Sequence, residues 1–576
     1  MEILRKKERN DAHPYIPELK ELYRGGRITR REFLRNATLL GMSLAGASTF
    51  LAGCAQEEAT ETPTEPPDTT APEATAPPEP TKATGPRRGG TLRVAARVQK
   101  VGHPATFSWI MQSNVVRQVA EYLTVTDREN ITHPYLLESW DASDDLQTWT
   151  LNLRQGITFN NGDDFGADDV VFTMQEWLDE NVGSSILGLM GYLSPDNIEK
   201  VDDYTVRLHL DRPEIAVPEH LFHYPSVILN HRTFEGDFLK APHGTGPYVV
   251  EEYNEGDRAL LKRRGDYWQN GADGEPLPYL DEMEFIEMGE DISAWIAAIQ
   301  SGEVDYLDLG DENPLDAYLT LGKNPEINVV PVPTAQCRVL RMRADLEPWS
   351  DNRVRQALRL CQNREKLINL SQFGEAFAGH DAHVCPVHPE YCEKPIQAYD
   401  PEKAKQLLAD AGYPDGLNVE IGVNAGVTDF VTMAEILKED AAPAGFNITI
   451  STMPASQYWE QWTELSLGIT PWTHRPLGTM VLNLAYTVDQ NGDPVPWNET
   501  RWVDEEFIEL LQEANGTLDV EKRRELFCEL EQIQMDRGSI GIAFWRNIWF
   551  MARNSVKNME GHPTYYMLFN EVWKEA

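Results

Sequence analysis

The sequence PYLLESWDASDDLQTWTLNLRQGITFNNGDDFGADDVVFT occupies residues 134–173. Within it, residues 149–153 alternate apolar and polar side chains, which is the period of a β-strand with one buried face. Gly156 and Gly162 follow, and glycine permits turns that other residues resist. The pair Asp168-Asp169 precedes an apolar run, so these carboxylates could cap a helix or join ion pairs. We therefore expect a strand, then turns, then a helix.

Similar patterns occur along the rest of the chain. Residues 89–95 read as a turn into a strand, and residues 204–210 alternate as a strand does. Asp400 and Pro401 form a typical helix start, apolar residues follow at helical spacing, and Gly412 can adopt the left-handed conformation that ends a helix. Strands mixed with helices throughout predict an α/β (mixed α+β) architecture.

Several short segments, spread in order over residues 89–576, carry a family pattern. They are residues 89–95, 134–173, 244–248 (GTGPY), 266–268, 279–281, 300–305 (QSGEVD), 351–358 (DNRVRQAL) and 400–414 (DPEKAKQLLADAGYP). Together they resemble the peptide/nickel (oligopeptide/dipeptide) family of extracytoplasmic solute-binding proteins, which serve ABC importers.

The resemblance implies a two-lobed, type II periplasmic-binding-protein fold with a hinge and an interlobe cleft. One lobe is expected to be discontinuous, with residues 89–333 plus 550–576 forming lobe 1 and an inserted subdomain at about 127–240. Residues 334–549 would form lobe 2. Ligand would lie between the lobes, where binding clefts commonly form.

The N-terminal segment has the features of an export signal. Arg30 and Arg31 precede a short apolar run that ends in LAGC at Cys54, and this run is shorter than the roughly 20 residues of a membrane-spanning helix. TRREFLR resembles a twin-arginine signal, and LAGC resembles a lipobox whose cysteine carries lipid. Residues 1–53 are therefore expected to be removed, which leaves a lipoprotein on the extracytoplasmic face of the membrane.

Residues 54–88 follow as the lipidated cysteine and a linker rich in Pro, Thr and Glu. Almost no large apolar side chain interrupts this linker, so it cannot form a core, and its prolines favour an extended spacer.

The formal net charge of −41 at pH 7 excludes some classes of partner. A nucleic-acid-binding protein needs a basic face, and electrostatic adhesion to anionic lipid headgroups is equally disfavoured. After residue 54 the sequence contains no Walker phosphate loop, no HExxH and no GxSxG motif. We expect neither an enzyme nor a cofactor, and we expect a monomer.

The candidate ligand-binding residues come from one late loop and from aromatic side chains. Peptide-binding relatives often carry Asp-Pro in this loop, which here reads ITPWTHRPLG at residues 469–478 and has Arg475 before the proline. Arginine suits a carboxylate or phosphate, not an ammonium. Trp472, His474 and Arg475 are therefore candidates, and an ion pair of Arg475 within the protein is the alternative. The aromatic candidates for stacking are Trp109, Tyr122, Trp462 and Trp497.

The segment GHDAHVCPVHPEYC at residues 379–392 combines histidines and cysteines. His380, His383 and His388, with Cys385 and Cys392, are ligand types for zinc, nickel or copper, but their spacing matches no standard zinc finger. A disulfide between Cys385 and Cys392 would consume both sulfurs, and spacing alone cannot decide the connectivity. We assign no metal site.

The leading interpretation is a lipoprotein that captures an oligopeptide-like or other polar organic solute for an ABC permease and ATPase complex. The alternatives are a nickel- or metallophore-binding protein of the same fold and an extracellular sensor or hydrolase.

Overall fold

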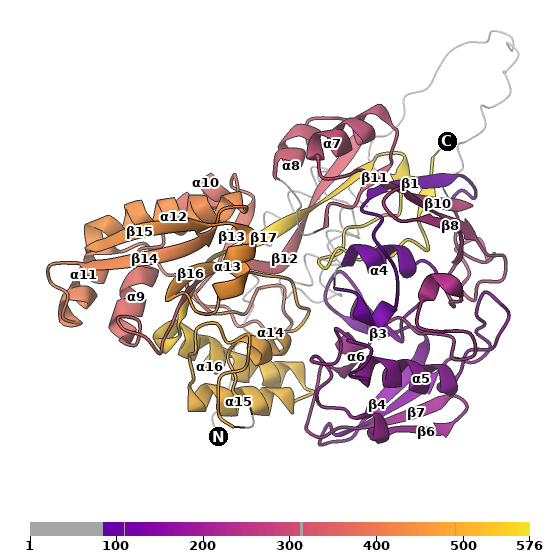
Figure 1. Ribbon diagram of the computed structural model, residues 1–576, viewed down its shortest axis with the longest axis horizontal. Coiled ribbons are helices and arrows are strands. Elements are labelled where there is room, and N and C mark those ends of the chain that lie inside the picture. The colour runs from indigo at the N-terminus through magenta and orange to yellow at the C-terminus, as the bar shows by residue number, and fades with distance from the viewer. Residues whose placement is uncertain (1–84, 109, 311–314, 490, 576) are drawn as a thin grey trace, which may run out of the picture. The chain divides into compact units, whose positions relative to one another are not determined.

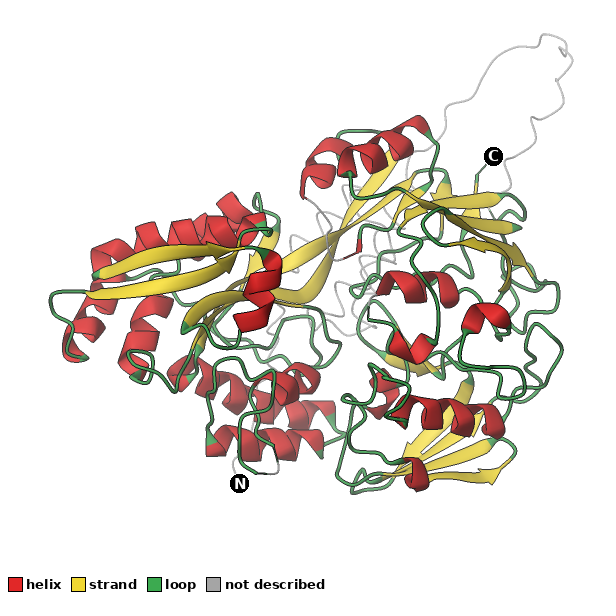
Figure 2. Ribbon diagram, viewed as in Figure 1, coloured by secondary structure: helices red, strands yellow, loops and turns green. Residues whose placement is uncertain are grey.

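The computed structural model describes residues 85–108, 110–310, 315–489 and 491–575, which belong to one compact unit spanning residues 84–576 (Figure 1). The expected signal with Arg30 and Arg31, the lipidation site Cys54 and nearly all of the linker lie outside the described residues. Helices and strands alternate through the unit (Figure 2). Among the described residues, no helix is both long enough and apolar enough to cross a membrane.

The largest sheet has eleven strands in the order β15-β14-β16-β12-β17-β11-β1-β10-β9-β8, with β13 paired to β17 beside this path. The strands are β15 (Phe446–Met453), β14 (Leu417–Asn424), β16 (Leu467–Trp472), β12 (Ile327–Met342), β17 (Ile540–Arg553), β11 (Tyr306–Leu307), β1 (Thr91–Ala96), β10 (Glu282–Glu287), β9 (Arg258–Arg263), β8 (Tyr248–Asn254) and β13 (Ala376–Ala378). The sheet combines parallel pairs, such as β1 with β10, and antiparallel pairs, such as β12 with β17.

Strands β12 and β17 connect the two ends of this sheet. The 16 residues of β12 reach about 50 Å at roughly 3.3 Å per residue. Its first part pairs from Ile327 with Arg553 to Pro333 with Asn547, and pairing resumes at Cys337 with Trp545. More residues lie between the pairs on β12 than on β17, so the ladder contains a bulge, a feature that bends a strand.

Side chains satisfy the backbone groups of the bulge, residues 334–336. The hydroxyl of Thr334 donates to the carbonyl of Arg546 (2.7 Å), and the N–H of Ala335 donates to Nδ1 of His474 (3.0 Å). The N–H of Gln336 donates to the hydroxyl of Thr334 (3.1 Å). These bonds replace the missing ladder bonds, so the irregularity is a specified part of the fold.

A separate four-stranded sheet contains the stretch that opened the sequence analysis. Its order is β4-β5-β7-β6, from β4 (Leu137–Ala142), β5 (Thr148–Leu153), β7 (Thr205–His209) and β6 (Ile198–Asp202), and helix α5 (Ala167–Leu178) packs on it. Gly156 and Gly162 have φ of 78° and 89°. Asp169 accepts the N–H of Gly166 (2.9 Å) at the start of α5, and Asp168 pairs with Lys200 (2.9 Å). The predicted strand, turns and capped helix are confirmed.

Helices cover the other end of the large sheet around a core shared with β14 and β15. They are α9 (Asn352–Leu360), α10 (Arg364–Ser371), α11 (Pro401–Asp410) and α12 (Thr428–Ala441). Asp400 accepts the N–H of Lys403 (2.9 Å) as the N-cap of α11, and Gly412 follows its end with φ of 99°. Both helix signals read from the sequence are confirmed.

The remaining elements flank these two sheets. They are α4 (Ile110–Val116), β2 (Thr124–Thr126), β3 (Thr132–Pro134), α6 (Val217–His220), α7 (Ile292–Ser301), α8 (Leu315–Leu321), α13 (Ala455–Gln461), α14 (Gly478–Ala485), α15 (Glu505–Asn515), α16 (Val520–Arg537), β18 (Val556–Lys557), β19 (Trp573–Lys574) and short 3₁₀ turns.

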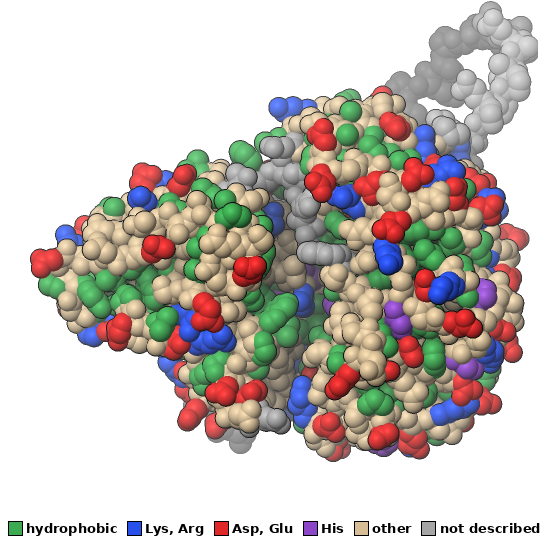
Figure 3. Space-filling view, viewed as in Figure 1, with side chains coloured by type: hydrophobic (Ala, Val, Ile, Leu, Met, Phe, Trp, Pro, Cys, Tyr) green, Lys and Arg blue, Asp and Glu red, His purple; other side chains and the backbone are tan. Residues whose placement is uncertain are grey.

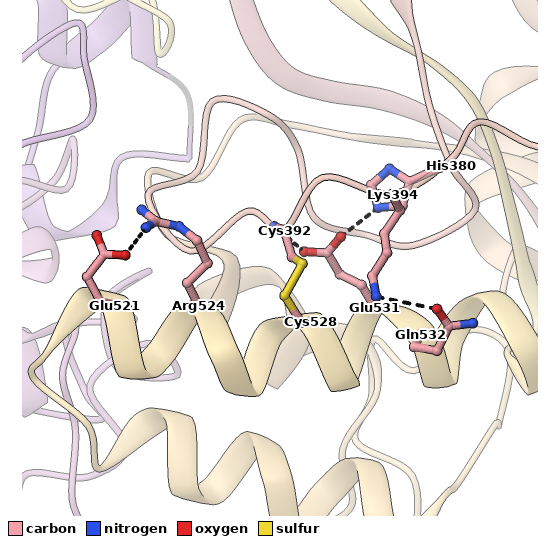
Figure 4. The surroundings of a disulfide bond; sticks show 8 residues. All are labelled: His380, Cys392, Lys394, Glu521, Arg524, Cys528, Glu531 and Gln532. Carbon is pink, nitrogen blue, oxygen red and sulfur yellow. Dashed lines mark hydrogen bonds and ion pairs between the residues drawn. A yellow bond between two sulfur atoms is a disulfide. The ribbon is translucent and has the colours of Figure 1, made fainter. Parts of the chain in front are cut away.

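The disulfide between Cys385 and Cys392 that the sequence left open is not formed. Cys392 is bonded to Cys528 of α16, 136 residues away, with 5.1 Å between the Cα atoms (Figure 4). Glu531, one turn further along α16, accepts the N–H of Cys392 (2.9 Å) and hydrogen-bonds Nε2 of His380 (2.8 Å), which fixes the loop on the helix. Cys385 instead is buried as a free thiol that donates to the carbonyl of Thr334 (3.4 Å).

The tip of the β2–β3 hairpin contacts the segments on the far side of the bulge. Asn130, at φ of 62°, donates from Nδ2 to the carbonyl of Val387 (2.9 Å), and its Oδ1 lies 2.9 Å from Nε2 of His474. Since Nδ1 of His474 accepts the N–H of Ala335, the ring proton is on Nε2 and is donated to Asn130. One side chain thereby joins the hairpin, the loop at Val387 and the bulge.

Removing the disulfide by Cys528→Ser is expected to lower the free energy of unfolding by about 2–5 kcal/mol, because the bridge closes a long loop in the unfolded chain. Denaturant titration of the full chain measures the loss. Reductant should lower the stability of the wild type by a similar amount and leave Cys528→Ser unchanged. Peptide mapping without reduction checks the pairing, and a linked Cys385–Cys392 peptide would contradict the structure.

Asn130→Gly is expected to cost about 1–3 kcal/mol, because it leaves the carbonyl of Val387 and the Nε2–H of His474 without a partner. Glycine also tolerates the positive φ, so backbone strain does not contribute. Asn558→Gly is the matched control, since Asn558 also has positive φ (55°) but makes its bond at an exposed site. Equal stabilities of the two variants in denaturant titrations would contradict the proposed contact.

Candidate functional site

A cavity of about 300 Å³ lies beside the bulge. One side is formed by residues between 108 and 130, by residues 219–224 and by residues 562–566. The other side is formed by Gln336, by residues 473–480 and by Trp497. This volume is at the lower end of ligand pockets in proteins, so the cavity suits a small molecule.

The loop after β16 supplies a cation to the cavity. Arg475 donates from Nη1 to the hydroxyl of Thr473 (2.7 Å) and to the carbonyl of His474 (3.1 Å), which holds the guanidinium against its own loop. The carbonyl of Arg475 hydrogen-bonds Nε2 of His388 (3.0 Å), while Nδ1 of His388 accepts the N–H of Cys385 (3.1 Å). The position of Arg475 therefore depends on the segment that the sequence analysis considered for metal.

Aromatic rings form much of the opposite wall. Phe222 and Tyr566 meet edge to face with 5.0 Å between centroids, and His562 stacks on Tyr566 at 5.2 Å. The guanidinium of Arg117 lies 4.0 Å from the centre of the Tyr566 ring. Trp497 is half exposed and packs edge to face on Trp472 at 5.8 Å. Such rings offer broad apolar contact to a ligand at low entropic cost.

The titratable groups at the cavity are mostly held neutral by burial. Burial lowers the pKa of His562 to about 4 and lowers the pKa of His474 well below its usual value. The pKa of His223 is lowered by burial and by the charge of Arg475. Burial raises the pKa of Glu219 to about 7, although its Oε1 accepts a hydrogen bond from Thr132 (2.8 Å).

The structure brings together three of the candidate residues. His474, Arg475 and Trp497 line the cavity. Trp472 does not, because its side chain is buried in the core and its Nε1 donates to Glu499 (2.9 Å). Contact of any of these residues with ligand stays a prediction.

The remaining aromatic candidates lie away from the cavity lining or outside the described residues. Tyr122 is buried behind Phe222, and its hydroxyl donates to the carbonyl of Tyr224 (2.9 Å). Trp462 packs on Trp459 at 5.8 Å and does not line the cavity. Trp109 lies outside the described residues.

Sequence reasoning missed Glu219, Phe222 and Tyr224, together with the segment around Tyr565 and Tyr566. The aromatic runs HLFHYP at residues 220–225 and HPTYYM at residues 562–567 were the available signals. Neither run matches a motif with an assigned role, and they are far apart in the chain. Their proximity in space depends on the fold.

The histidines and cysteines of residues 379–392 have structural partners. His383 hydrogen-bonds the hydroxyl of Tyr486 (2.8 Å) through Nδ1 and lies near the Cys337 sulfur (3.5 Å). The partners of the other members, described above, are Glu531 for His380, the carbonyl of Arg475 for His388, Cys528 for Cys392 and the carbonyl of Thr334 for Cys385. Among the described residues, no group of three or more His, Cys, Asp or Glu side chains is arranged to hold a metal ion. This segment supports the loop that carries Arg475.

Comparisons with known proteins agree with this architecture. Residues 132–492, more than half of the chain, match the family described as "Bacterial extracellular solute-binding proteins, family 5 Middle". The glutathione-binding protein GsiB of Salmonella paratyphi A is 26% identical over 431 residues, which cover 71% of this chain and 79% of GsiB.

Solved structures show the same fold. HbpA2 from Haemophilus parasuis superposes with a TM-score of 0.74 at 22% identity, covering 84% of this chain and 100% of HbpA2. DppA from Helicobacter pylori, a periplasmic binding protein in complex with the peptide STSA, gives 0.67 at 22% identity, covering 85% and 99%. The predicted type II periplasmic-binding-protein fold is confirmed. The chain thus belongs to family 5 of the bacterial extracellular solute-binding proteins.

Proposed function

We propose that this protein captures a polar organic solute, with oligopeptide-like molecules in its range, in the cavity beside the bulge. It then delivers the solute to an ABC permease and ATPase complex, and it makes or breaks no covalent bond. The observation that carries this proposal is the cavity itself. Its walls join a cation, Arg475, with aromatic rings from distant parts of the chain, and the long strands β12 and β17 connect these parts within the large sheet. The descriptions of GsiB as glutathione-binding and of DppA as a peptide complex support this class of ligand.

The motion that we propose is closure of two lobes about the bulge. Residues 89–333 with 550–576 would form lobe 1, including the inserted subdomain at about 127–240, and residues 334–549 would form lobe 2. A bulge suits a hinge because the N–H groups of Ala335 and Gln336 bond to side chains and not to the facing strand. Solute favours the closed state only through its higher affinity for that state.

We further propose that the mature protein is a monomeric lipoprotein on the extracytoplasmic face of the membrane. Arg30 and Arg31 would direct export and Cys54 would carry the lipid. The acidic and proline-rich residues 54–88 would then space the binding unit from the bilayer.

A saturating solute is expected to raise the unfolding free energy by about 2.7 kcal/mol at one hundred times its Kd, because it binds only the folded protein. Thermal melts against a panel of di- and tripeptides, glutathione and organic acids measure this shift. Tryptophan fluorescence should change with the same ligands, and Trp497→Phe should reduce the change, since Trp497 is half exposed at the cavity. Trp459→Phe is the control, because Trp459 is similarly exposed but does not line the cavity. If no member of the panel shifts either signal, capture of polar solutes is wrong.

Cys54→Ser is expected to abolish incorporation of radiolabelled palmitate and to release the protein from the membrane fraction. Replacing both Arg30 and Arg31 by Lys is expected to leave uncleaved precursor inside the cell. Cys361→Ser is the control for labelling, because Cys361 is buried in a core. Unchanged labelling in Cys54→Ser would rule out this site of lipidation.

A further inference from the structure

The charge of the cavity limits the solutes that it can hold. Of the described residues that line it, only Arg475 and Glu219 would carry a charge at neutral pH with ordinary pKa values. Burial raises the pKa of Glu219 to about 7, so this carboxyl group is partly protonated at neutral pH, while the arginine stays charged. The lining histidines are neutral because burial lowers their pKa values. Among the described lining residues, Arg475 therefore keeps its full charge at neutral pH, whereas Glu219 does not.

A second cation lies directly behind the aromatic wall. Arg117 is 6% exposed, and its Nε and Nη2 have no hydrogen-bond partner among the described residues. Its guanidinium packs against the rings of Tyr566 (4.0 Å) and Phe222 (5.4 Å), and both of these residues line the cavity. Cation–π contacts offset only part of the cost of burying a charge, so an anion in the cavity would stabilise Arg117 through space.

The carboxyl group of Glu219 is buried at the edge of the cavity. Its Oε1 accepts a hydrogen bond from Thr132 (2.8 Å), and its buried Oε2 has no partner among the described residues. When it is protonated on Oε2, the group carries no charge and does not repel a solute carboxylate. A solute ammonium would instead need an ionised carboxylate, and Arg475 at the same cavity opposes the approach of a cation.

The rest of the lining is largely apolar. The rings of Phe222, Tyr566 and Trp497 line the cavity, and Met480 adds an adaptable apolar side chain. These surfaces suit a flat or compact apolar body, and a volume of about 300 Å³ suits a small one.

We propose that the solute is a small organic acid that needs no ammonium group. Arg475 binds its carboxylate, and its apolar body packs against the aromatic wall. This inference rests on the proposed capture of a polar organic solute and names the chemical class.

Matched probes test the inference. Each probe set consists of an acid, a primary amide and a primary amine that share one body, which is phenyl, indolyl, cyclohexyl or butyl. The probes are titrated into the full chain, and the heat of binding and the tryptophan fluorescence are recorded. At least one acid is expected to bind ten or more times more tightly than its amide, and its amine is expected not to bind. Arg475→Gln should weaken that acid tenfold or more and leave the amide within about threefold, since a hydrogen bond to a charged group contributes roughly 1.5–3 kcal/mol.

Two control variants make the result specific. Arg207→Gln removes an arginine from β7 in the four-stranded sheet, where it pairs with Glu199, so acid binding should not change. Arg475→Lys keeps the charge without the planar fork and should retain part of the affinity. Melting of each ligand-free variant shows whether it is folded, and if Arg475→Gln is unfolded, the ranking of acid, amide and amine by the wild type decides alone.

The outcomes separate this inference from the proposed function. Tighter binding of amines, or of zwitterionic peptides with no effect of Arg475→Gln, would overturn the organic acid and leave solute capture standing. Absence of binding by every probe and by the peptide panel would overturn both.

Discussion

The pairing of β12 with β17 is the constraint on which the rest of the structure depends. These strands link the part of the large sheet that contains β1 and β10 to the part that contains β14 and β16. Their ladder breaks at residues 334–336, and side chains of Thr334 and His474 take over the backbone bonds there. The cavity lies at this break because Gln336 and His474 contribute to both. An uninterrupted ladder would place regular strand where the cavity has polar side chains.

The loop that carries Arg475 is held by a chain of supports that begins at α16. The disulfide from Cys528 and the carboxyl group of Glu531 fix the segment around Cys392, and His388 of that segment binds the carbonyl of Arg475. His388 acts as a neutral hydrogen-bonding group here, since burial lowers its pKa to about 4. Acidic side chains are distributed over the visible outer face (Figure 3), whereas the charged side chains that line the cavity are Arg475 and Glu219, with its buried carboxyl group. The negative net charge of the whole chain therefore gives no guide to the solute.

Local sequence signals predicted local structure well. Alternation at residues 149–153 and the cap at Asp400 depend on neighbours in the chain, so the strand and the helix could be read directly. The disulfide could not be read in this way. Cys385 and Cys392 are close in sequence, but burial of Cys385 at the bulge and contact of Cys392 with α16 separate them. The family segments predicted the fold because many short matches, each weak alone, occur in the same order along this chain as in the family.

The candidate site was predicted only where the order of the family segments located a loop in the sequence. Arg475 and His474 precede a proline in a loop that the family pattern locates, and both line the cavity. Trp472 ends β16, and its side chain enters the core, which the loop sequence did not reveal. Phe222 and Tyr566 meet only through tertiary packing, so no pattern in either segment identifies them.

The two ends of the large sheet are connected by the paired strands β12 and β17 and not by one flexible linker, and this has a consequence for the rate of solute binding. Twisting the two parts of the sheet against each other would break paired N–H and C=O groups on both sides of the bulge, whereas bending at residues 334–336 leaves those pairs intact. The proposed closure would therefore follow one bending direction. In that case the rate of solute association would scale with the fraction of time that the protein spends bent open along that direction, independently of how tightly the solute is finally bound.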